Sequence, residues 1–280
     1  MDPDVAHAVS LKESDLAAWL RARRSVLVGY SGGVDSTYLA VVAREVLGRE
    51  NAVAVLGRSA SVPMEQSERA RAIAGEHDID LRLVDTGELA DPRYAANPVN
   101  RCYFCKSVLW EVLVPMARGL GIETVVDGTN ADDVLEYRPG AKAGGEHGVE
   151  SPLAVVGLTK AEIRVLSRAR GLATWSQPSA PCLASRIPYG TEVTAERLEQ
   201  VERAEQALRE LGIQGNLRVR HHGVLARIEM DTGVIDEWLE PRNARRLVES
   251  VRAAGFQRVT VDLCGFRSGS LNVLEGVVAA

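Results

Sequence analysis

The segment GYSGGVDS, residues 29–36, carries the clearest chemical signal in the sequence. The β-branched run SVLVGY (25–30) leads into it, and a helical pattern over 36–47 follows it. Backbone N–H groups of a glycine-rich turn and the positive end of a helix dipole together bind anions, so the segment predicts a phosphate site for magnesium ATP. Its serines add hydroxyl donors, and its aspartate positions the loop or a Mg²⁺ ion. The expected nucleotide-binding residues are Ser31, Gly32, Gly33, Val34, Asp35 and Ser36.

This segment differs from two common phosphate-binding motifs. It lacks the GK[ST] ending of a Walker A loop and the G-x-G-x-x-G of a dinucleotide site. SGGVDS instead resembles the PP-loop of the ATP pyrophosphatases, which grips pyrophosphate while the α-phosphate is attacked. That resemblance implies that a substrate oxygen becomes adenylated. A Gly-Ser turn without a ligand is the alternative.

Cys182 is the candidate nucleophile for such an adenylate. It lies in APCLASR, four positions before Arg186, and neighbouring cations favour the thiolate form of a cysteine. The alternative is a small buried hydrophobic residue, which is how many lone cysteines behave. We expect that second environment for Cys264, which lies beside Leu263 on a predicted strand.

Cys102 and Cys105 form a C-x-x-C at the start of a predicted helix. Such a pair binds zinc, ligates an iron–sulfur cluster or acts as a redox dithiol. A structural zinc site needs four protein ligands, and no second C-x-x-C is present. With Cys182, the pair would suit a [4Fe–4S] cluster with one open iron. A thiol function without metal and an inert pair remain the alternatives.

Arg218 and Arg220 alternate on a predicted strand, so their side chains share one face. Two guanidinium groups on one face are typical of a site for phosphate or carboxylate. A solvated strand edge is the alternative.

The order of elements predicts two domains. Apolar strands and amphipathic helices alternate over the first 175 residues, which is typical of an α/β domain with a doubly wound parallel sheet. A polar loop over 130–158 precedes a helix capped by Thr159, where Glu162 completes a capping box. The expected strands are 25–30, 52–57, 81–86 and 124–129, and the expected helices are 36–47, 63–77 and 104–118.

Three prolines within 175–190 mark the predicted boundary between domains 1–180 and 181–280. The second domain is expected to be a smaller α+β unit. Its expected elements are a helix over 195–211 capped by Thr194, a hairpin of 217–222 and 225–230, a helix over 241–254 and a strand over 258–263.

Composition limits the partners and the compartment. Against 33 Lys and Arg stand 38 Asp and Glu, a net charge of −5, which disfavours a nucleic-acid partner. Four cysteines without a disulfide framework indicate a reducing compartment, and the cytoplasm is the expected location. No apolar stretch is long enough to span a membrane, so no membrane partner is expected.

A set of motifs in a fixed order resembles the LarE family of ATP-dependent sulfur transferases. The resemblance spans nearly the whole chain, and PCLASRIPYG after the C-x-x-C is its most specific part. The matching segments are GYSGGVDS, NRCYFCK (100–106), DGTNADD (127–133), SPLAVVGLTKAEIR (151–164), PCLASRIPYG (181–190) and GFRSGSLN (265–272).

The resemblance implies a reaction and a site. LarE proteins adenylate the carboxylates of pyridinium-3,5-biscarboxylic acid mononucleotide and convert them to thiocarboxylates for the nickel-pincer nucleotide cofactor. In one-cysteine members, the residue matching Cys182 gives up its own sulfur and becomes dehydroalanine. Three-cysteine members are thought to hold a [4Fe–4S] cluster whose extra sulfide is the donor, and Cys102, Cys105 and Cys182 match that type. The cysteine at 182 is then either a nucleophile or a cluster ligand.

The same resemblance assigns basic residues to the substrate and a further group to ATP. The small mononucleotide substrate would be bound by Arg186, Arg218, Arg220 and Arg267. Gly128, Thr129 and Asp132 follow a predicted strand, at the sheet edge where α/β proteins bind ligands, and are expected in the nucleotide pocket. Family members assemble, so a homo-oligomer is expected.

The sequence leaves three other functions open. A PP-loop tRNA thiolase can also use a C-x-x-C with a third cysteine, although it binds a polyanion. An ammonia-using PP-loop synthetase needs no thiols. A non-catalytic nucleotide or redox sensor would bind ATP without turnover.

Overall fold

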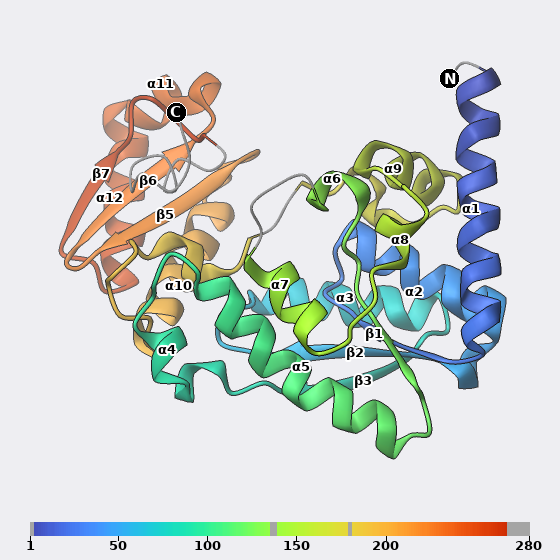
Figure 1. The fold of residues 1–280 in the computed structure, drawn as a ribbon. Coiled ribbons are helices and arrows are strands. Elements are labelled where there is room, and N and C mark those ends of the chain that lie inside the picture. Colours follow the sequence, from blue (N-terminus) through green and yellow to red (C-terminus); the bar gives the residue numbers. More distant parts are fainter. Residues whose placement is uncertain (1–2, 135–138, 179–180, 268–280) are drawn as a thin grey trace. The chain divides into compact units, whose positions relative to one another are not determined.

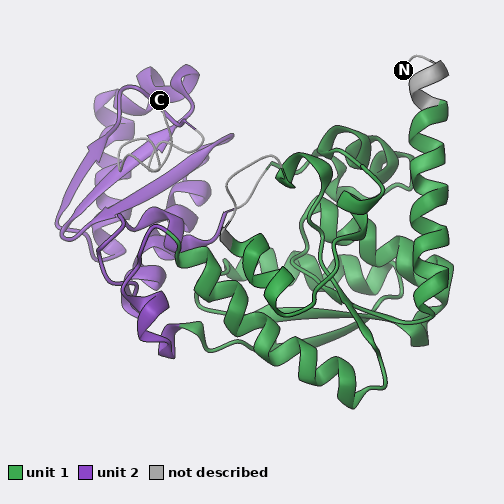
Figure 2. Cartoon of the chain, in the orientation of Figure 1, with its two compact units in different colours: residues 1–88, 100–180 green, residues 89–99, 181–280 purple. Residues whose placement is uncertain are grey.

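A computed structural model describes residues 3–134, 139–178 and 181–267 of the chain. These residues form two compact units (Figure 2). Unit 1 comprises Met1–Glu88 and Asn100–Ala180, and unit 2 comprises Leu89–Val99 and Pro181–Ala280. A short segment in the first half of the sequence therefore belongs to unit 2.

Unit 1 is built on a parallel sheet with the strand order β3-β2-β1-β4 (Figure 1). The central strand β1 pairs in register with both neighbours, since Val26 is opposite Ala52 and Thr124. Strands that are covered on both faces are apolar along their whole length, which explains the runs VLVG and AVAVLG. The strands are β1 (Val26–Gly29), β2 (Ala52–Arg58), β3 (Asp80–Asp85) and β4 (Thr124–Val126).

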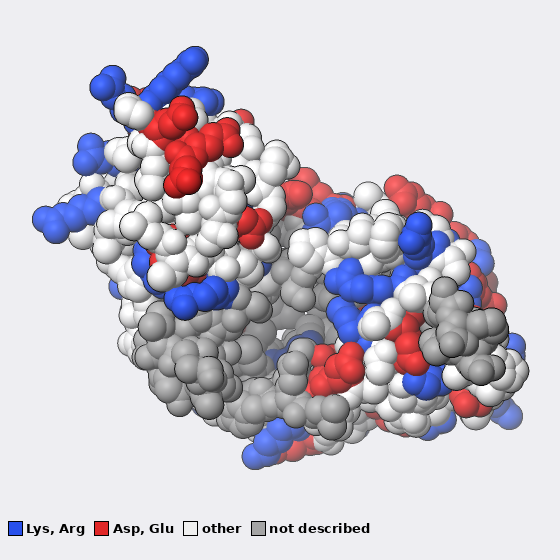
Figure 3. Space-filling model, turned by 90° about the horizontal axis from the view of Figure 1, so that it is seen from above, with Lys and Arg blue, Asp and Glu red and all other residues white. Residues whose placement is uncertain are grey.

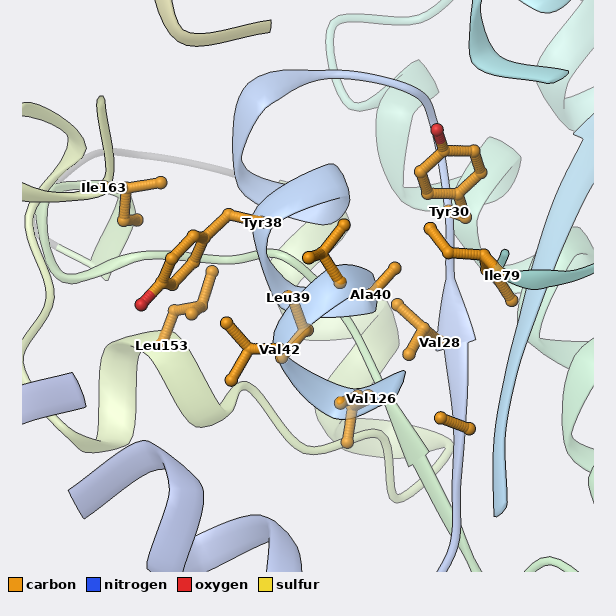
Figure 4. Close-up of a cluster of buried hydrophobic side chains, with 14 of the residues drawn as sticks. Val28, Tyr30, Tyr38, Leu39, Ala40, Val42, Ile79, Val126, Leu153 and Ile163 are labelled. Carbon is orange, nitrogen blue, oxygen red and sulfur yellow. The ribbon is translucent and has the colours of Figure 1, made fainter. Parts of the chain in front are cut away.

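Helices cover both faces of this sheet, so the predicted doubly wound α/β fold is confirmed. Val26 and Val28 pack into one buried cluster with α1, α2 and α9, part of which Figure 4 shows. Leu27 points to the opposite face, into a cluster with α5 and α7. The helices of unit 1 are α1 (Pro3–Arg23), α2 (Val34–Leu47), α3 (Met64–Glu76), α5 (Arg101–Gly119), α6 (Ala131–Val134), α7 (Pro139–Glu146), α8 (Pro152–Val155) and α9 (Lys160–Ala169).

Unit 2 contains a three-stranded mixed sheet, the smaller α+β part that the sequence predicts. Strands β5 (Leu217–His222) and β6 (Leu225–Met230) form the predicted antiparallel hairpin, and β7 (Arg258–Val261) pairs parallel to β6. Its helices are α4 (Pro92–Ala95), α10 (Ala195–Glu210), α11 (Thr232–Leu239) and α12 (Pro241–Ala253). Short 3₁₀ helices of the two units cover Arg49–Asn51, Glu88–Ala90, Ala173–Ser176 and Leu183–Arg186.

The segment 89–99 is integral to unit 2. Asn97 is fully buried with a positive φ of 55°, and its side-chain amide donates to the carbonyls of Pro188 and Thr191, each at 2.8 Å. Val193 N–H donates to the Ala95 carbonyl at 2.8 Å. These bonds tie the segment 89–99 to backbone groups of residues 188–193.

Two local expectations were wrong. The expected loop over 130–158 contains α6, α7 and α8, with residues 135–138 outside the described part. Strand β7 ends at Val261, and a turn at Gly265, with φ of 69°, follows it. Cys264 is therefore exposed instead of buried.

None of the described helices is long and apolar enough to span a membrane.

Candidate functional site

The PP-loop lies between the end of β1 and the start of α2. Gly33 is the N-cap of α2, and among the described residues no side chain caps this helix end. The N–H groups in the first turn of α2 are therefore not occupied by a capping side chain. Such N–H groups can bind an anionic ligand. Ser31 Oγ lies 3.0 Å from Ser36 Oγ, and Ser31 N–H donates to Ser36 Oγ at 3.2 Å. The two serines therefore hold the loop closed on itself.

Two glycines allow close packing around this loop. Gly32 has φ of 71°, and a Cβ added there would lie 2.4 Å from the Ala70 Cβ. A Cβ at Gly128 would lie 2.9 Å from the Ser36 nitrogen. The chain leaving β4 therefore passes directly against the first turn of α2, which brings Gly128 to the PP-loop.

The segment after β4 is held by its own side chains. Asp127 is buried and accepts hydrogen bonds from Thr129 Oγ1 at 2.8 Å and Ser151 Oγ at 2.7 Å. Asp132 Oδ2 accepts from the backbone N–H of Lys160 at 2.7 Å. Thr129 and Asp132 are thus fixed at the carboxyl edge of the sheet.

Lys160 is a site residue that the sequence analysis missed. Its ammonium group forms an ion pair with Asp35, a residue of the PP-loop segment. The Asp35 side chain is 17% exposed, and its Oδ1 is buried without a hydrogen-bond partner among the described residues. The available signal was the TK pair that opens a capped helix at the end of the SPLAVVGLTKAEIR segment.

Two carboxylates near the PP-loop could serve as protein ligands of a magnesium ion. Asp35 and Asp132 are both linked to Lys160. In the described part of the chain, no group of three or more His, Cys, Asp or Glu side chains is arranged to hold a metal ion. Protein sites for Mg²⁺ commonly supply one or two carboxylates and take the other ligands from phosphates and water. The residues present fit that pattern.

Cys102 and Cys105 lie in unit 1, on the first turns of α5. Residues three apart on a helix are neighbours on its surface, so the two thiols share one face. Cys102 is exposed and Cys105 half-buried. Helix α7 packs closely against this end of α5, because a Cβ at Gly140 would lie 3.0 Å from Lys106 Cγ and 3.5 Å from the Cys102 carbonyl oxygen.

Cys182 lies in unit 2, half-buried, and directly precedes the 3₁₀ helix Leu183–Arg186. Arg186 is 3% exposed. It makes a bidentate pair with Glu205 at 2.9 and 2.8 Å, and donates to the carbonyls of Pro181 and Cys182 at 2.6 and 3.1 Å. The guanidinium group therefore lies inside the protein, against the backbone that carries Cys182.

The two arginines of β5 differ in their surroundings. Arg220 is buried and donates to the Ser185 carbonyl at 2.9 Å and to Glu229 at 2.6 Å. Arg218 is more open, and its guanidinium carbon lies 5.1 Å from the centre of the Phe266 ring. Burial, with the positive charge of Arg186, lowers the pKa of Arg218 to about 10.

The fourth expected arginine follows Phe266 in the chain. Arg267 is exposed. The rest of the GFRSGSLN segment, residues 268–272, lies outside the described residues.

Comparisons with known proteins identify the family. A family model described as NAD synthase matches residues 18–94, which include the PP-loop. An uncharacterized protein of Synechocystis sp. is 48% identical over 88% of this chain and 91% of its own length. The pyridinium-3,5-bisthiocarboxylic acid mononucleotide synthase of Lactiplantibacillus plantarum is 34% identical over 94% of this chain and 95% of its own length. The chain belongs to the LarE family.

More distant relatives of this LarE-family chain share a part of it. The glutamine-hydrolysing GMP synthase of Aeropyrum pernix is 30% identical over 64% of the chain, and that match covers 38% of the synthase. The family and the PP-loop together identify the chain as an ATP-binding transferase of the LarE kind.

Proposed function

We propose that this LarE-family protein is an ATP-dependent sulfur transferase acting on pyridinium-3,5-biscarboxylic acid mononucleotide. It converts both carboxylates to thiocarboxylates for the nickel-pincer nucleotide cofactor and releases AMP and pyrophosphate. The observation that carries the proposal is the 34% identity, over nearly the full length of both chains, to a protein named as the bisthiocarboxylic acid mononucleotide synthase. The PP-loop cradle between β1 and α2 supports the adenylation step.

In the first step, a carboxylate oxygen of the substrate attacks the α-phosphorus of ATP. The bond from that phosphorus to the bridging oxygen breaks, and pyrophosphate leaves. The PP-loop residues 31–36 would bind the leaving pyrophosphate through backbone N–H groups and the Ser31 and Ser36 hydroxyls. Gly128 and Thr129 would border the nucleotide, and Asp35 and Asp132 would hold Mg²⁺. Lys160 would add a positive charge beside the phosphates.

In the second step, a sulfur nucleophile replaces AMP on the activated carboxyl carbon. A [4Fe–4S] cluster, when bound, would supply sulfide, and Cys102, Cys105 and Cys182 would hold it. Thiolates are the ligands that iron–sulfur clusters take, and Cys102 and Cys105 share one face of α5, which supports this part of the proposal.

The other route uses the sulfur of Cys182 itself. The thiolate attacks the acyl-adenylate and AMP leaves, which forms a thioester. Removal of the Cys182 α-proton then breaks the Cβ–S bond, so that the thiocarboxylate leaves and dehydroalanine remains.

The substrate's phosphate would be bound in unit 2. Arg218 is half-buried, with its guanidinium beside the Phe266 ring, and the exposed Arg267 is the next residue after Phe266 in the chain. Arg220 adds a buried positive charge on the same face of β5. Arg186, the other arginine that the sequence analysis expects at the substrate, has its guanidinium bonded to Glu205 and is left out of this phosphate site.

The charge distribution supports a small substrate over tRNA. On the face shown in Figure 3, basic and acidic side chains of the described residues are interspersed, and the whole chain has a net charge of −5. A tRNA thiolase would need a basic surface along the polyanion. Binding of tRNA in a gel shift, lost as salt is raised, would favour the thiolase instead.

We further propose that the protein is a cytoplasmic homo-oligomer without membrane partners. Light scattering would measure the oligomeric state, and cell fractionation would show the location.

The proposal is tested by anaerobic turnover with ATP and the biscarboxylate mononucleotide. AMP and pyrophosphate should appear only with this substrate, and the product should gain the mass of sulfur in place of oxygen. The intact mass of the protein then separates the two sulfur sources. A loss equal to hydrogen sulfide marks Cys182 as the donor, whereas an unchanged mass with bound iron marks a cluster. ATP that binds but is never cleaved would overturn the proposal in favour of a sensor.

A further inference from the structure

We propose that Arg186 and Glu205 form a buried clamp that positions the backbone around Cys182, and that Arg186 acts through this loop instead of through contact with the substrate. The inference rests on the function proposed for Cys182. Arg186 is 3% exposed, and the side chain of Glu205 is 16% exposed. A guanidinium this deeply buried is poorly placed to receive a diffusing anion.

The donors of Arg186 are directed at two targets. Nε and Nη2 bind the two carboxylate oxygens of Glu205 at 2.9 and 2.8 Å, the bidentate geometry that fixes a guanidinium plane. Nη1 faces the other way and donates to the carbonyls of Pro181 and Cys182 at 2.6 and 3.1 Å, and to Ser185 Oγ at 3.1 Å. The plane set by Glu205 therefore dictates where these two carbonyls lie.

Glu205 ties the clamp to the regular elements of unit 2. It is a residue of α10, and its Oε1 also accepts the backbone N–H of Val219 on β5 at 2.9 Å. One carboxylate thus joins a helix, a strand and the loop of Cys182. A reacting group held by rigid elements through such contacts keeps its geometry, which catalysis requires.

A second buried arginine reinforces the same loop. Arg220 donates to the Ser185 carbonyl at 2.9 Å and is paired with Glu229. Removing the charge of Glu205 would leave Arg186 buried without its counter-ion, a strongly unfavourable state. The loop would then rearrange so that Arg186 reaches water, while Arg220 continues to hold Ser185.

The test measures the reactivity of the Cys182 thiol in the full-length protein, without ATP or substrate. Iodoacetamide labelling is followed by peptide mass spectrometry, with the exposed Cys264 as an internal reference in the same unit. In Glu205→Gln and Arg186→Ala, labelling of the half-buried Cys182 should accelerate about tenfold, which corresponds to about 1.4 kcal/mol, while Cys264 is unchanged. The double variant should accelerate no further than either single one, because both changes release the same loop.

The matched control is Glu199→Gln. Glu199 also belongs to α10 but is exposed and pairs with Arg203 on the helix surface. In this variant, Cys182 should be labelled at the same rate as in the parent protein. Parental Cys182 labelling rates in both Glu205→Gln and Arg186→Ala, with folding intact by circular dichroism, would overturn the proposal. If Arg186→Ala does not fold, Glu205→Gln alone decides, since it keeps the size and one acceptor.

Steady-state kinetics separate positioning from substrate contact. Arg186→Lys keeps a positive charge but cannot make the bidentate pair. A positioning role predicts a kcat lower by about tenfold or more with a KM for the mononucleotide within about twofold of the parent value. A raised KM with an unchanged kcat would show direct binding and contradict the clamp. Because labelling needs no turnover, failure of the proposed reaction would leave the labelling result intact.

Discussion

An alanine at position 32 would meet the protein's own backbone and side chains. Gly32 has φ of 71°, which side chains rarely tolerate, and an added Cβ would lie 2.4 Å from that of Ala70. We predict that Gly32→Ala lowers the free energy of unfolding by about 1–3 kcal/mol and abolishes ATP binding, because the loop must shift away from α3. Urea unfolding and calorimetric titration with magnesium ATP measure the two effects.

The control is the neighbouring glycine. Gly33 has φ of −78°, and the contact nearest to an added Cβ is Ser31 Oγ at 3.4 Å. Gly33→Ala should therefore unfold at nearly the parental urea concentration. Equal stabilities of the two variants would show that the approach of the loop to Ala70 is unimportant.

The ion pair of Lys160 with Asp35 leads to a separate prediction about the affinity for magnesium ATP. Lys160→Met keeps the length of the side chain but removes its charge from beside Asp35. Loss of a charge-assisted contact to phosphate costs about 1.5–3 kcal/mol, so the Kd for magnesium ATP should rise by about tenfold or more. Titration against the parent and against Lys142→Met, a change at a residue whose side chain is 74% exposed, checks this. An unchanged Kd in Lys160→Met would contradict a phosphate contact.

At the scale of secondary structure, Glu162 connects the start of α9 to α1. It accepts from Lys12 Nζ at 2.7 Å and from the Thr159 N–H at 2.8 Å. Burial opposes ionisation, but these hydrogen bonds outweigh it and lower the pKa of Glu162 below the ordinary value of 4.5. A lowered folded-state pKa means that the carboxylate stabilises the protein above pH 4.5 and loses this effect as pH falls through its folded-state pKa.

We therefore predict a pH-dependent cost for Glu162→Gln. The variant should be about 1–2 kcal/mol less stable than the parent at neutral pH, and the difference should shrink towards zero as pH falls through the lowered folded-state pKa of Glu162. Urea unfolding from about pH 8 to about pH 3 measures it. Glu65→Gln, at an 86% exposed position of α3, serves as the reference. A difference that stays constant with pH would argue against the ionised capping box.

Elements with strong local signals were predictable from the sequence. The capping box of Thr159 and Glu162 and the Thr194 cap were confirmed, because both depend on residues close together in the chain. Helix α1 had no such signal, since its buried apolar residues Val9, Leu16 and Leu20 are sparse. The short helices α6, α7 and α8 were missed because helices of four to eight residues owe their stability to tertiary packing.

The candidate site was predictable to a similar extent. The PP-loop is a continuous segment, so its residues could be named from spacing alone. The ion pair of Lys160 with Asp35 joins residues 125 positions apart, and spacing carries no information about it. The burial of Arg186 could not be predicted from the sequence either. Its partner Glu205 lies on α10 among several other glutamates, and the sequence does not indicate which of them pairs with Arg186.

At the scale of the whole molecule, unit 2 is assembled from two separate stretches of sequence. The Asn97 amide bonds three carbonyls, those of Ile187, Pro188 and Thr191. We predict that Asn97→Ala lowers the free energy of unfolding by about 2–4 kcal/mol, since it leaves buried acceptors unsatisfied. Thermal unfolding checks this, with the exposed Asn51→Ala as reference. A loss no larger than that of the reference would contradict it.

The split origin of unit 2 limits how it can be transplanted. A recombinant fragment that begins at residue 181 would omit the buried Tyr94 and Asn97. Grafting the thiol-bearing unit onto another nucleotide-binding domain would therefore require a discontinuous fusion. Residues 89–99 would have to be inserted ahead of the recipient's own sequence, or supplied as a synthetic peptide. In proteins of this architecture the chain passes between the units three times, at 88/89, 99/100 and 180/181, so an exchange of units must preserve three junctions where an ordinary tandem fusion has one.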